Sequence, residues 1–252
     1  MNEIIFNNAT RIAVAGLQAA IMVAIVRRRS HRQFPFFLAY AGYSALIDTL
    51  LTVIGVDARH QPKWFHFYSS TQVIYTVLGV LAMHESFRKA LRPYFLGKRW
   101  FHFLVPGVVL VILLLCGWKA LRQSPAQSEY ATLLYLAAYL ASDYMRAAIF
   151  GLFAILVIFW HARWQPCAFG VMKGFGFYTI VGMLADLLRS DFGTKSLWFF
   201  VYAPSVAYIV ACLIWLGAFL QREPETRSSQ TGSLADLDEI LELLTRLKKA
   251  RE

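Results

Sequence analysis

An acid and a base stand three residues apart in a long apolar stretch of the chain. Asp143 and Arg146 lie in a run that continues to Trp160. Together with Tyr135 and Tyr139 they follow spacings of four, four and three, which place all four on one face if the helix is continuous. Such a pair could hold a ligand of either charge or bond to itself. It could also snorkel to an interface and only fix packing.

Ionisable residues also interrupt other apolar runs, among them Asp48, His66 and Asp186. Ionisable side chains within membrane helices are costly and usually face an interior or a water cavity. Asp48 is the most deeply placed acid, and a structural hydrogen bond and a functional role fit it equally well. His66, close to Trp64, is also typical of an interfacial residue. We expect the ligand-binding residues to be Asp48, His66, Tyr139, Asp143, Arg146 and Asp186.

No catalytic or metal-binding motif accompanies these residues. The six histidines never form HExxH or HxxxH, and the three cysteines never form CxxC. The sequence also lacks GxSxG, a Walker sequence and GxGxxG. We therefore predict a protein that is not an enzyme, with no catalytic residues, no metal and no cofactor.

The composition indicates which elements position the polar residues. Hydrophobic residues make up 58% of the 252 residues and charged residues 16%, whereas a soluble domain has about 25% charged residues. A helix needs about 20 apolar residues to cross a bilayer. We predict an all-α polytopic membrane bundle with seven transmembrane helices, at Ile5–Val26, Pro35–Gly55, Trp64–Met83, Phe101–Trp118, Ala141–Trp160, Ala168–Leu188 and Leu197–Leu220.

The basic residues predict the orientation of this bundle. Loops that keep Lys and Arg usually stay in the cytoplasm. Arg27, Arg28, Arg29 and Arg32 follow the first run, and another basic group, from Arg88 to Arg99, follows the third. We therefore place the N-terminus outside and the C-terminus in the cytoplasm, with most of the polar residues of the helices in the outer half. Since orientation explains the net charge of +10, we predict no nucleic-acid partner.

Residues 131–140 leave two alternatives open. This segment, ATLLYLAAYL, is apolar and continuous with the fifth run. A single helix over Tyr130–Trp160 would be ~46 Å long at 1.5 Å per residue and would have to tilt or project outward. Alternatively, the segment lies at the interface or re-enters the membrane on the outer side.

After the transmembrane domain at 1–220, the composition changes. Residues 221–232 are polar and predict a flexible linker. Residues 233–252 predict a short amphipathic cytoplasmic helix, with Ser233 as N-cap and Asp236 at the capping-box position. Such a helix is marginal alone in water and needs a partner, either another copy in a coiled coil or another protein. Its apolar face holds Leu234, Leu237, Ile240, Leu241, Leu244 and Leu247.

Together these features predict a sensor or receptor-like protein of the bacterial inner membrane. The layout is similar to that of seven-helix sensory modules in bacterial membranes, which have an outside N-terminus and a cytoplasmic linker and helix. We expect a small ligand to enter from the outer side and the C-terminal helix to signal through self-association or a partner protein. A small-solute transporter or channel and a scaffold subunit of a membrane complex are the alternatives.

Overall fold

The computed structural model describes residues 2–54, 62–91, 101–123, 130–160, 166–192 and 197–221. The chain divides into two compact units, Met1–Gln221 and Arg222–Glu252. The second unit, which contains the predicted linker and amphipathic helix, lies outside the described residues.

Every described element of the first unit is helical, as predicted. Each of the seven predicted runs coincides with a helix, and several helices extend beyond the predicted ends. A single 3₁₀ turn, η1 (Ser30–Arg32), follows the first helix. The seven α-helices are α1 (Asn2–Arg27), α2 (Pro35–Ile54), α3 (Pro62–Ala90), α5 (Phe101–Gln123), α6 (Tyr130–Trp160), α7 (Pro166–Phe192) and α8 (Leu197–Leu220).

Prolines and one strained residue set several helix boundaries. Pro35, Pro62 and Pro166 each occupy the first position of a helix, where the missing N–H leaves no bond unmade and the fixed φ suits the helix. Arg29 has a φ of 55°, and this left-handed residue ends α1 and turns the chain toward η1. The turn lets α2 run back alongside α1.

Four helices in the described residues are long and apolar enough to cross a membrane. The apolar segments His102–Trp118 and Tyr144–Phe159, within α5 and α6, are shorter. Many large apolar side chains of these helices are exposed on the surface of the bundle, such as Leu114, Trp118 and Phe159. These features indicate a membrane protein whose outer surface contacts the lipid bilayer. The four spans are Asn8–Arg27, Pro35–Val53, Pro166–Ala185 and Tyr202–Leu220.

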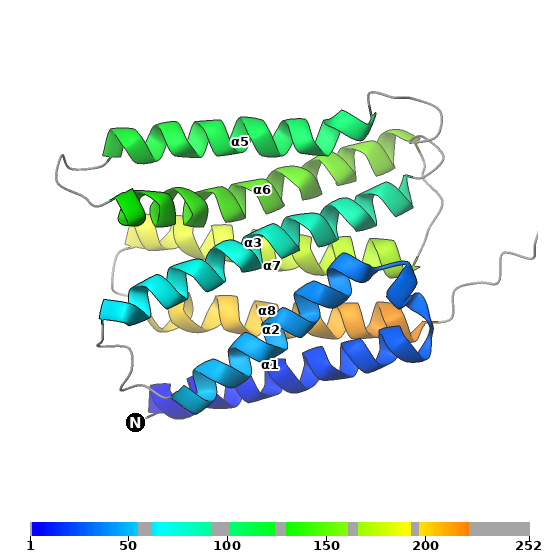
Figure 1. Cartoon of the computed structure of the whole chain (residues 1–252), viewed down its shortest axis with the longest axis horizontal. Helices are drawn as coiled ribbons and strands as arrows, with labels where there is room; N and C mark the ends of the chain where they lie inside the picture. The colour runs from blue at the N-terminus through cyan, green and yellow to red at the C-terminus, as the bar shows by residue number, and fades with distance from the viewer. Residues whose placement is uncertain are drawn as a thin grey trace, which may run out of the picture. The chain divides into compact units, whose positions relative to one another are not determined.

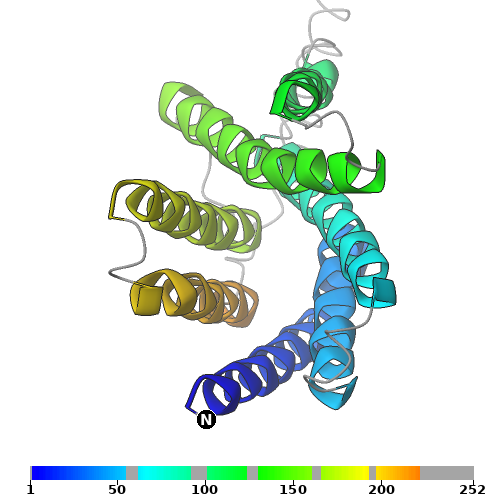
Figure 2. The ribbon, with the colours of Figure 1, turned by 90° about the vertical axis from the view of Figure 1, so that its left-hand side faces the viewer.

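The helices pack so that the first and last are neighbours (Figures 1 and 2). Helix α1 packs against α2 and α8, and α7 packs against α8. Helix α3 contacts α2, α6 and α7, whereas α5 packs mainly against α6. Successive helices run in opposite directions, so α1 begins and α8 ends at opposite ends of the bundle (Figure 1). We call the end with Arg27–Arg29 the arginine end and the other the N-terminal end.

Residues 131–140 belong to α6, which is one helix over Tyr130–Trp160. At 1.5 Å per residue this helix is ~46 Å long, longer than the hydrocarbon layer of about 30 Å. Of the two alternatives that the sequence left open, the backbone thus shows the continuous helix. The backbone positions of Tyr135, Tyr139, Asp143 and Arg146 therefore share one face of α6.

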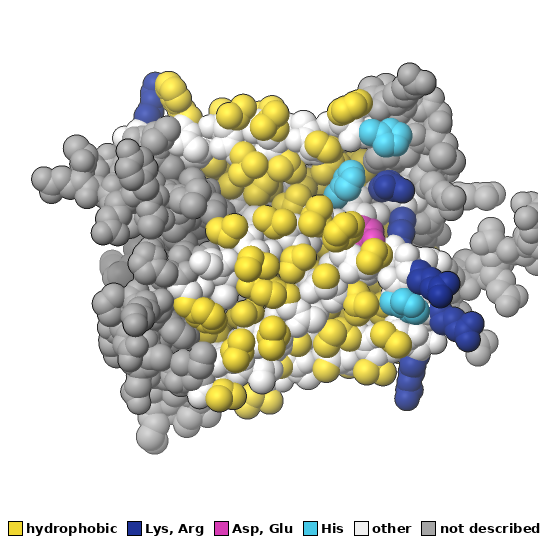
Figure 3. All heavy atoms as spheres, viewed as in Figure 1, with side chains coloured by type: hydrophobic (Ala, Val, Ile, Leu, Met, Phe, Trp, Pro, Cys, Tyr) yellow, Lys and Arg dark blue, Asp and Glu magenta, His cyan; other side chains and the backbone are white. Residues whose placement is uncertain are grey.

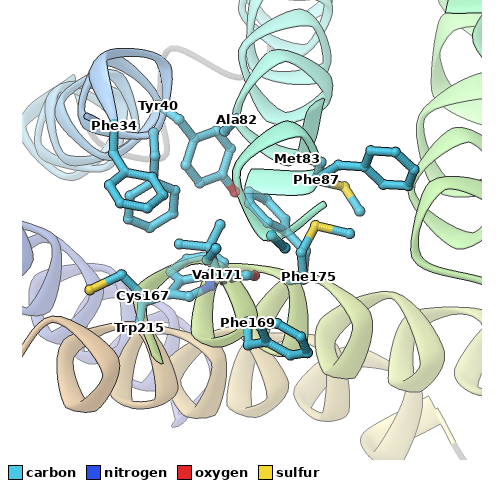
Figure 4. Close-up of a cluster of buried hydrophobic side chains, with 14 of the residues drawn as sticks. Phe34, Tyr40, Ala82, Met83, Phe87, Cys167, Phe169, Val171, Phe175 and Trp215 are labelled. Carbon is cyan, nitrogen blue, oxygen red and sulfur yellow. Dashed lines mark hydrogen bonds between the residues drawn. The ribbon is translucent and has the colours of Figure 1, made fainter. Parts of the chain in front are cut away.

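An aromatic core joins α2, α3, α7 and α8 toward the arginine end (Figure 4). Phe37 contacts Trp215 with ring centroids 5.3 Å apart and Phe219 at 5.4 Å. The Trp215 indole N–H donates to the carbonyl oxygen of Val171, 3.0 Å away. Because a buried indole N–H needs an acceptor, this bond fixes Trp215 between α7 and α8.

The described surface separates apolar and charged side chains (Figure 3). Hydrophobic side chains cover the middle of the visible face, and most described Lys and Arg side chains gather at the arginine end. There, the guanidinium of Arg28 donates to the backbone carbonyls of Leu220 and Gln221. A cation at a helix C-terminus is stabilising, so Arg28 ties the end of α1 to the end of α8.

Candidate ligand site

Three tyrosine hydroxyls meet inside the bundle. Tyr40 of α2 donates to Tyr75 of α3 over 2.6 Å, and Tyr75 donates to Tyr208 of α8. The oxygens of Tyr40 and Tyr208 are 3.3 Å apart. Ser44 of α2 and Gln18 of α1 complete the group, each 3.0 Å from the Tyr208 hydroxyl. We call these five residues the tyrosine cluster.

The cluster is buried near mid-depth of the helices that form it. Ser44, Tyr75 and Tyr208 lie near the midpoints of α2, α3 and α8. Gln18, Tyr40 and Ser44 are almost completely buried. A polar group buried without a hydrogen bond is costly, so the hydroxyls must satisfy one another. The cluster thereby links the three consecutive helices α1, α2 and α3 with the distant α8.

Gln18 gives this network an unused acceptor. Its amide nitrogen donates to the Tyr208 hydroxyl at 3.0 Å and contacts the Cys212 sulfur at 3.4 Å. Its amide oxygen is buried and has no hydrogen-bond partner among the described residues. Each such buried atom needs an explanation, and a bound hydrogen-bond donor is one.

Asp48 extends the cluster toward the N-terminal end. Its carboxylate accepts from the Ser44 hydroxyl at 3.4 Å and interacts electrostatically with Arg11 of α1. Arg11 also donates to the backbone carbonyl of Leu51, 3.2 Å away. Asp48 is only partly buried. It therefore connects the buried hydroxyls with a more accessible, charged region between α1 and α2.

Arg146 flanks the cluster from α6. Only 6% of Arg146 is exposed. Its guanidinium donates to the backbone carbonyl and the hydroxyl of Ser142, and it lies over the Tyr178 ring, 5.3 Å from the centroid. The Tyr178 ring in turn contacts the Tyr208 ring edge to face. The charge of Arg146 also acts on Tyr40. The cluster therefore lies between the acid Asp48 and the base Arg146.

The structure brings together two of the six predicted ligand residues. Asp48 and Arg146 approach the tyrosine cluster from different helices. The side chains of His66, Tyr139, Asp143 and Asp186 lie outside the described residues. The predicted pairing of Asp143 with Arg146 thus stays a prediction. The polar partner of Arg146 that the structure describes is Ser142.

Sequence reasoning missed the residues at the centre of the site. Tyr40, Ser44 and Asp48 recur every four residues, which places them on one face of α2. Tyr208 and Cys212 have the same spacing in α8. This periodicity of polar residues was the available signal.

Aromatic rings close the cluster on the side of the arginine end. The Tyr40 ring lies 5.1 Å from Phe175 and 5.9 Å from Trp215, both edge to face. Tyr208 contacts the same tryptophan at 6.0 Å. These rings separate the hydroxyls from the arginine end, so the polar connection of the cluster runs toward Asp48 and Arg11.

The described residues of the site offer hydrogen-bonding groups and charges to a ligand. They contain no group of three or more His, Cys, Asp or Glu side chains placed to hold a metal ion. Comparison with protein-family models, with curated proteins and with solved structures finds no match to this chain. The geometry of the cluster therefore carries the functional argument.

Proposed function

We propose that this protein is a receptor-like sensor of a small ligand in the bacterial inner membrane, and that it is not an enzyme. The observation that carries the proposal is the tyrosine cluster, in which hydroxyl and amide groups of α1, α2, α3 and α8 converge between Asp48 and Arg146. Intramembrane polar and ionisable residues are usually functional, since burying them is costly. A ligand at this position contacts several helices at once.

The proposed mechanism is a shift between two helix packings. A ligand can shift such an equilibrium only if it binds the two packings with different affinity. Helix α8 contributes Tyr208 to the cluster and ends at Leu220. In this mechanism a change in how Tyr208 is bonded is transmitted along α8 to the predicted linker, and the helix predicted for 233–252 passes it to another copy or to a partner protein.

A thermal-shift panel tests this proposal. The full-length protein in lipid nanodiscs is unfolded by heat at a series of pH values. It is also unfolded in the presence of alkali cations, divalent cations, small amines, carboxylic acids or sugars. A ligand that binds the folded state raises the unfolding temperature, and the rise grows with the logarithm of the ligand concentration above its Kd. We expect one chemical class to do so in the wild type and not in Tyr208→Phe, while Tyr144→Phe, on the exposed face of α6, behaves like the wild type.

Flux through proteoliposomes separates the sensor from its main rival. A transporter moves the stabilising compound down its gradient, and a sensor binds it without net flux. Saturable uptake that Tyr208→Phe abolishes would replace the sensor proposal by a transporter. If no compound stabilises the wild type and Tyr208→Phe only disrupts oligomers or complexes, the scaffold alternative is correct.

A further inference from the structure

The hydroxyls next to Asp48 form a chain with a defined direction. Tyr40 donates to Tyr75, and Tyr75 donates to Tyr208. Ser44 donates to the Asp48 carboxylate over 3.4 Å, the longest link. A hydroxyl has one hydrogen, and the hydrogen of Ser44 is used on Asp48. Tyr208 must therefore donate across the 3.0 Å that separate it from Ser44, so every hydrogen of the chain points toward Asp48.

The Tyr208 hydroxyl joins the chain to Gln18, and it makes all the hydrogen bonds that a phenol hydroxyl can make. A phenol oxygen can accept two hydrogen bonds and donate one. The Tyr208 oxygen accepts from the Gln18 amide and from Tyr75, and it donates to Ser44. The more distant Tyr40 oxygen, at 3.3 Å, is left as a neighbour without a full bond to Tyr208.

The same atoms allow the opposite direction once Asp48 carries a proton. A carboxylic acid donates where a carboxylate only accepts, so Asp48 then donates to Ser44 and Ser44 donates to Tyr208. Tyr208 accepts from Gln18 and Ser44 and donates to Tyr75, which donates to Tyr40. Each internal hydroxyl keeps its number of hydrogen bonds, so the two directions differ at the ends of the chain, Asp48 and Tyr40.

The reversal ends at Tyr40, whose hydrogen it releases from Tyr75. Tyr40 and Gln18 both contact the Tyr208 hydroxyl, and the Gln18 amide oxygen is buried without a donor among the described residues. The two directions of the chain thus differ in the hydrogen bonds of Tyr40, and the cluster contains a buried acceptor on α1 in both.

We propose that the ligand of this site is a proton, which binds Asp48 and reverses the hydroxyl chain from Ser44 to Tyr40. This inference rests on the proposed sensor function and names its ligand. Hydronium transfers one proton to the Asp48 carboxylate and leaves as water, and the hydroxyl hydrogens reorient by rotation. The proton enters at Asp48, because Asp48 is partly exposed whereas Ser44 and Gln18 are buried.

Groups on all the neighbouring helices take part in the change of charge at Asp48. Arg11 faces Asp48 from α1, Cys212 from α8 acts on it electrostatically, and Tyr75 of α3 reaches it through the chain. The described part of η1 approaches the other end of α2. Protonation leaves Arg11 without the counter-charge of Asp48, which weakens the link between α1 and α2.

Infrared difference spectroscopy across a pH step tests the inference on full-length protein in nanodiscs. In the wild type, acidification should raise a carboxylic-acid C=O band and shift the tyrosine C–O bands together. Asp48→Asn should lose both changes. Ser44→Ala should keep the carboxylic-acid band and lose the tyrosine shift. Thr49→Ala is the control, because the exposed Thr49 hydroxyl bonds to the carbonyl of Ala45 in its own helix, and it should match the wild type.

The outcomes separate this inference from the sensor proposal. A tyrosine shift that persists in Asp48→Asn, or a wild type without an Asp48-dependent acid band, overturns the proton as ligand. If another compound of the thermal-shift panel still acts through Tyr208, the sensor proposal stands. Conversely, another outcome is that the protein takes up a proton at Asp48 and also shows net proton flux. That result supports Asp48 as the proton site and overturns the sensor proposal in favour of a transporter. Circular dichroism and gel filtration confirm that each variant is folded, and an unfolded Ser44→Ala is replaced by Ser44→Cys.

Discussion

At the scale of single residues, one carboxylate of α3 completes the beginning of α2. The first N–H groups of a helix have no acceptor within the helix. The Glu85 carboxylate accepts from the N–H of Phe37 at 3.1 Å. Beside it, the ammonium of Lys89 lies 3.6 Å from the centroid of the Phe34 ring. Neighbouring residues of α3 thus fix where α2 starts.

Replacing this carboxylate should destabilise the protein. Glu85→Ala removes the acceptor for the Phe37 N–H and should lower the free energy of unfolding by about 1 kcal/mol, as the loss of a helix cap does. Glu85→Gln keeps an oxygen acceptor and should lose less. Equilibrium unfolding in mixed detergent micelles measures both. Equal stability of Glu85→Ala and the wild type would show that the contact contributes nothing.

Residues of the candidate site differed in how visible they were in the sequence. Asp48 and Arg146 stood out because charge is rare in apolar helices. The tyrosines did not, because tyrosine in a membrane protein is usually interfacial. Which tyrosines meet depends on the packing of α2, α3 and α8, and the spacing within one helix carries no information on its neighbours.

At the scale of elements, α7 and α8 approach closely because α7 presents glycines to its neighbour. A Cβ atom at Gly170 would lie 2.1 Å from the Cβ of Ala218. One at Gly174 would lie 2.1 Å from the Trp215 indole nitrogen, which is held by its bond to Val171. Small residues at such positions let membrane helices pack closely.

Gly174→Ala should therefore separate these helices. Insertion of a methyl group into a filled interface typically costs about 1–3 kcal/mol, and we expect a loss of this size in the free energy of unfolding. The matched control is Gly182→Ala in the same helix, where a Cβ meets nothing within 4 Å. It should be neutral or more stable by up to about 1 kcal/mol. Thermal unfolding followed by tryptophan fluorescence compares the two, and equal midpoints would contradict the prediction.

The sequence predicted the existence of the helices better than their ends. Apolar runs follow from contact with lipid, so all seven appeared in the sequence. Helix α3 was predicted to end at Met83 but extends to Ala90. The additional turns hold polar residues such as Glu85 and Lys89, which hydropathy leaves out although they continue the backbone hydrogen bonds. Residues 131–140 likewise continue the backbone hydrogen bonds of α6 beyond the predicted start at Ala141.

At the scale of the whole described unit, alternating helices put positive charge at one end. Arg27, Arg28, Arg29 and Arg32 lie between α1 and α2, and Arg88 and Lys89 end α3. Figure 3 shows this gathering of basic side chains beside an apolar surface. From the positive-inside rule we predict that the arginine end faces the cytoplasm.

Labelling of single cysteines tests this orientation. Gln33 is exposed at the arginine end, and Arg122 is exposed at the N-terminal end. In intact spheroplasts, a membrane-impermeant thiol reagent should label Arg122→Cys and leave Gln33→Cys unlabelled until the membrane is opened. The three native cysteines are buried, and the wild type measures their background. The reverse pattern would invert the orientation and place Asp48 nearer the cytoplasm.

Contact between the first and last helices has a consequence for biogenesis. Membrane helices leave the ribosome in order, so Gln18, Ser44, Tyr40 and Tyr75 enter the bilayer before Tyr208 exists. The polar groups that Tyr208 satisfies must until then find substitutes in water, lipid headgroups or an insertion factor. A nascent chain that stops before α8 therefore holds these polar groups in the membrane without Tyr208, and the insertion of α8 completes their hydrogen bonds.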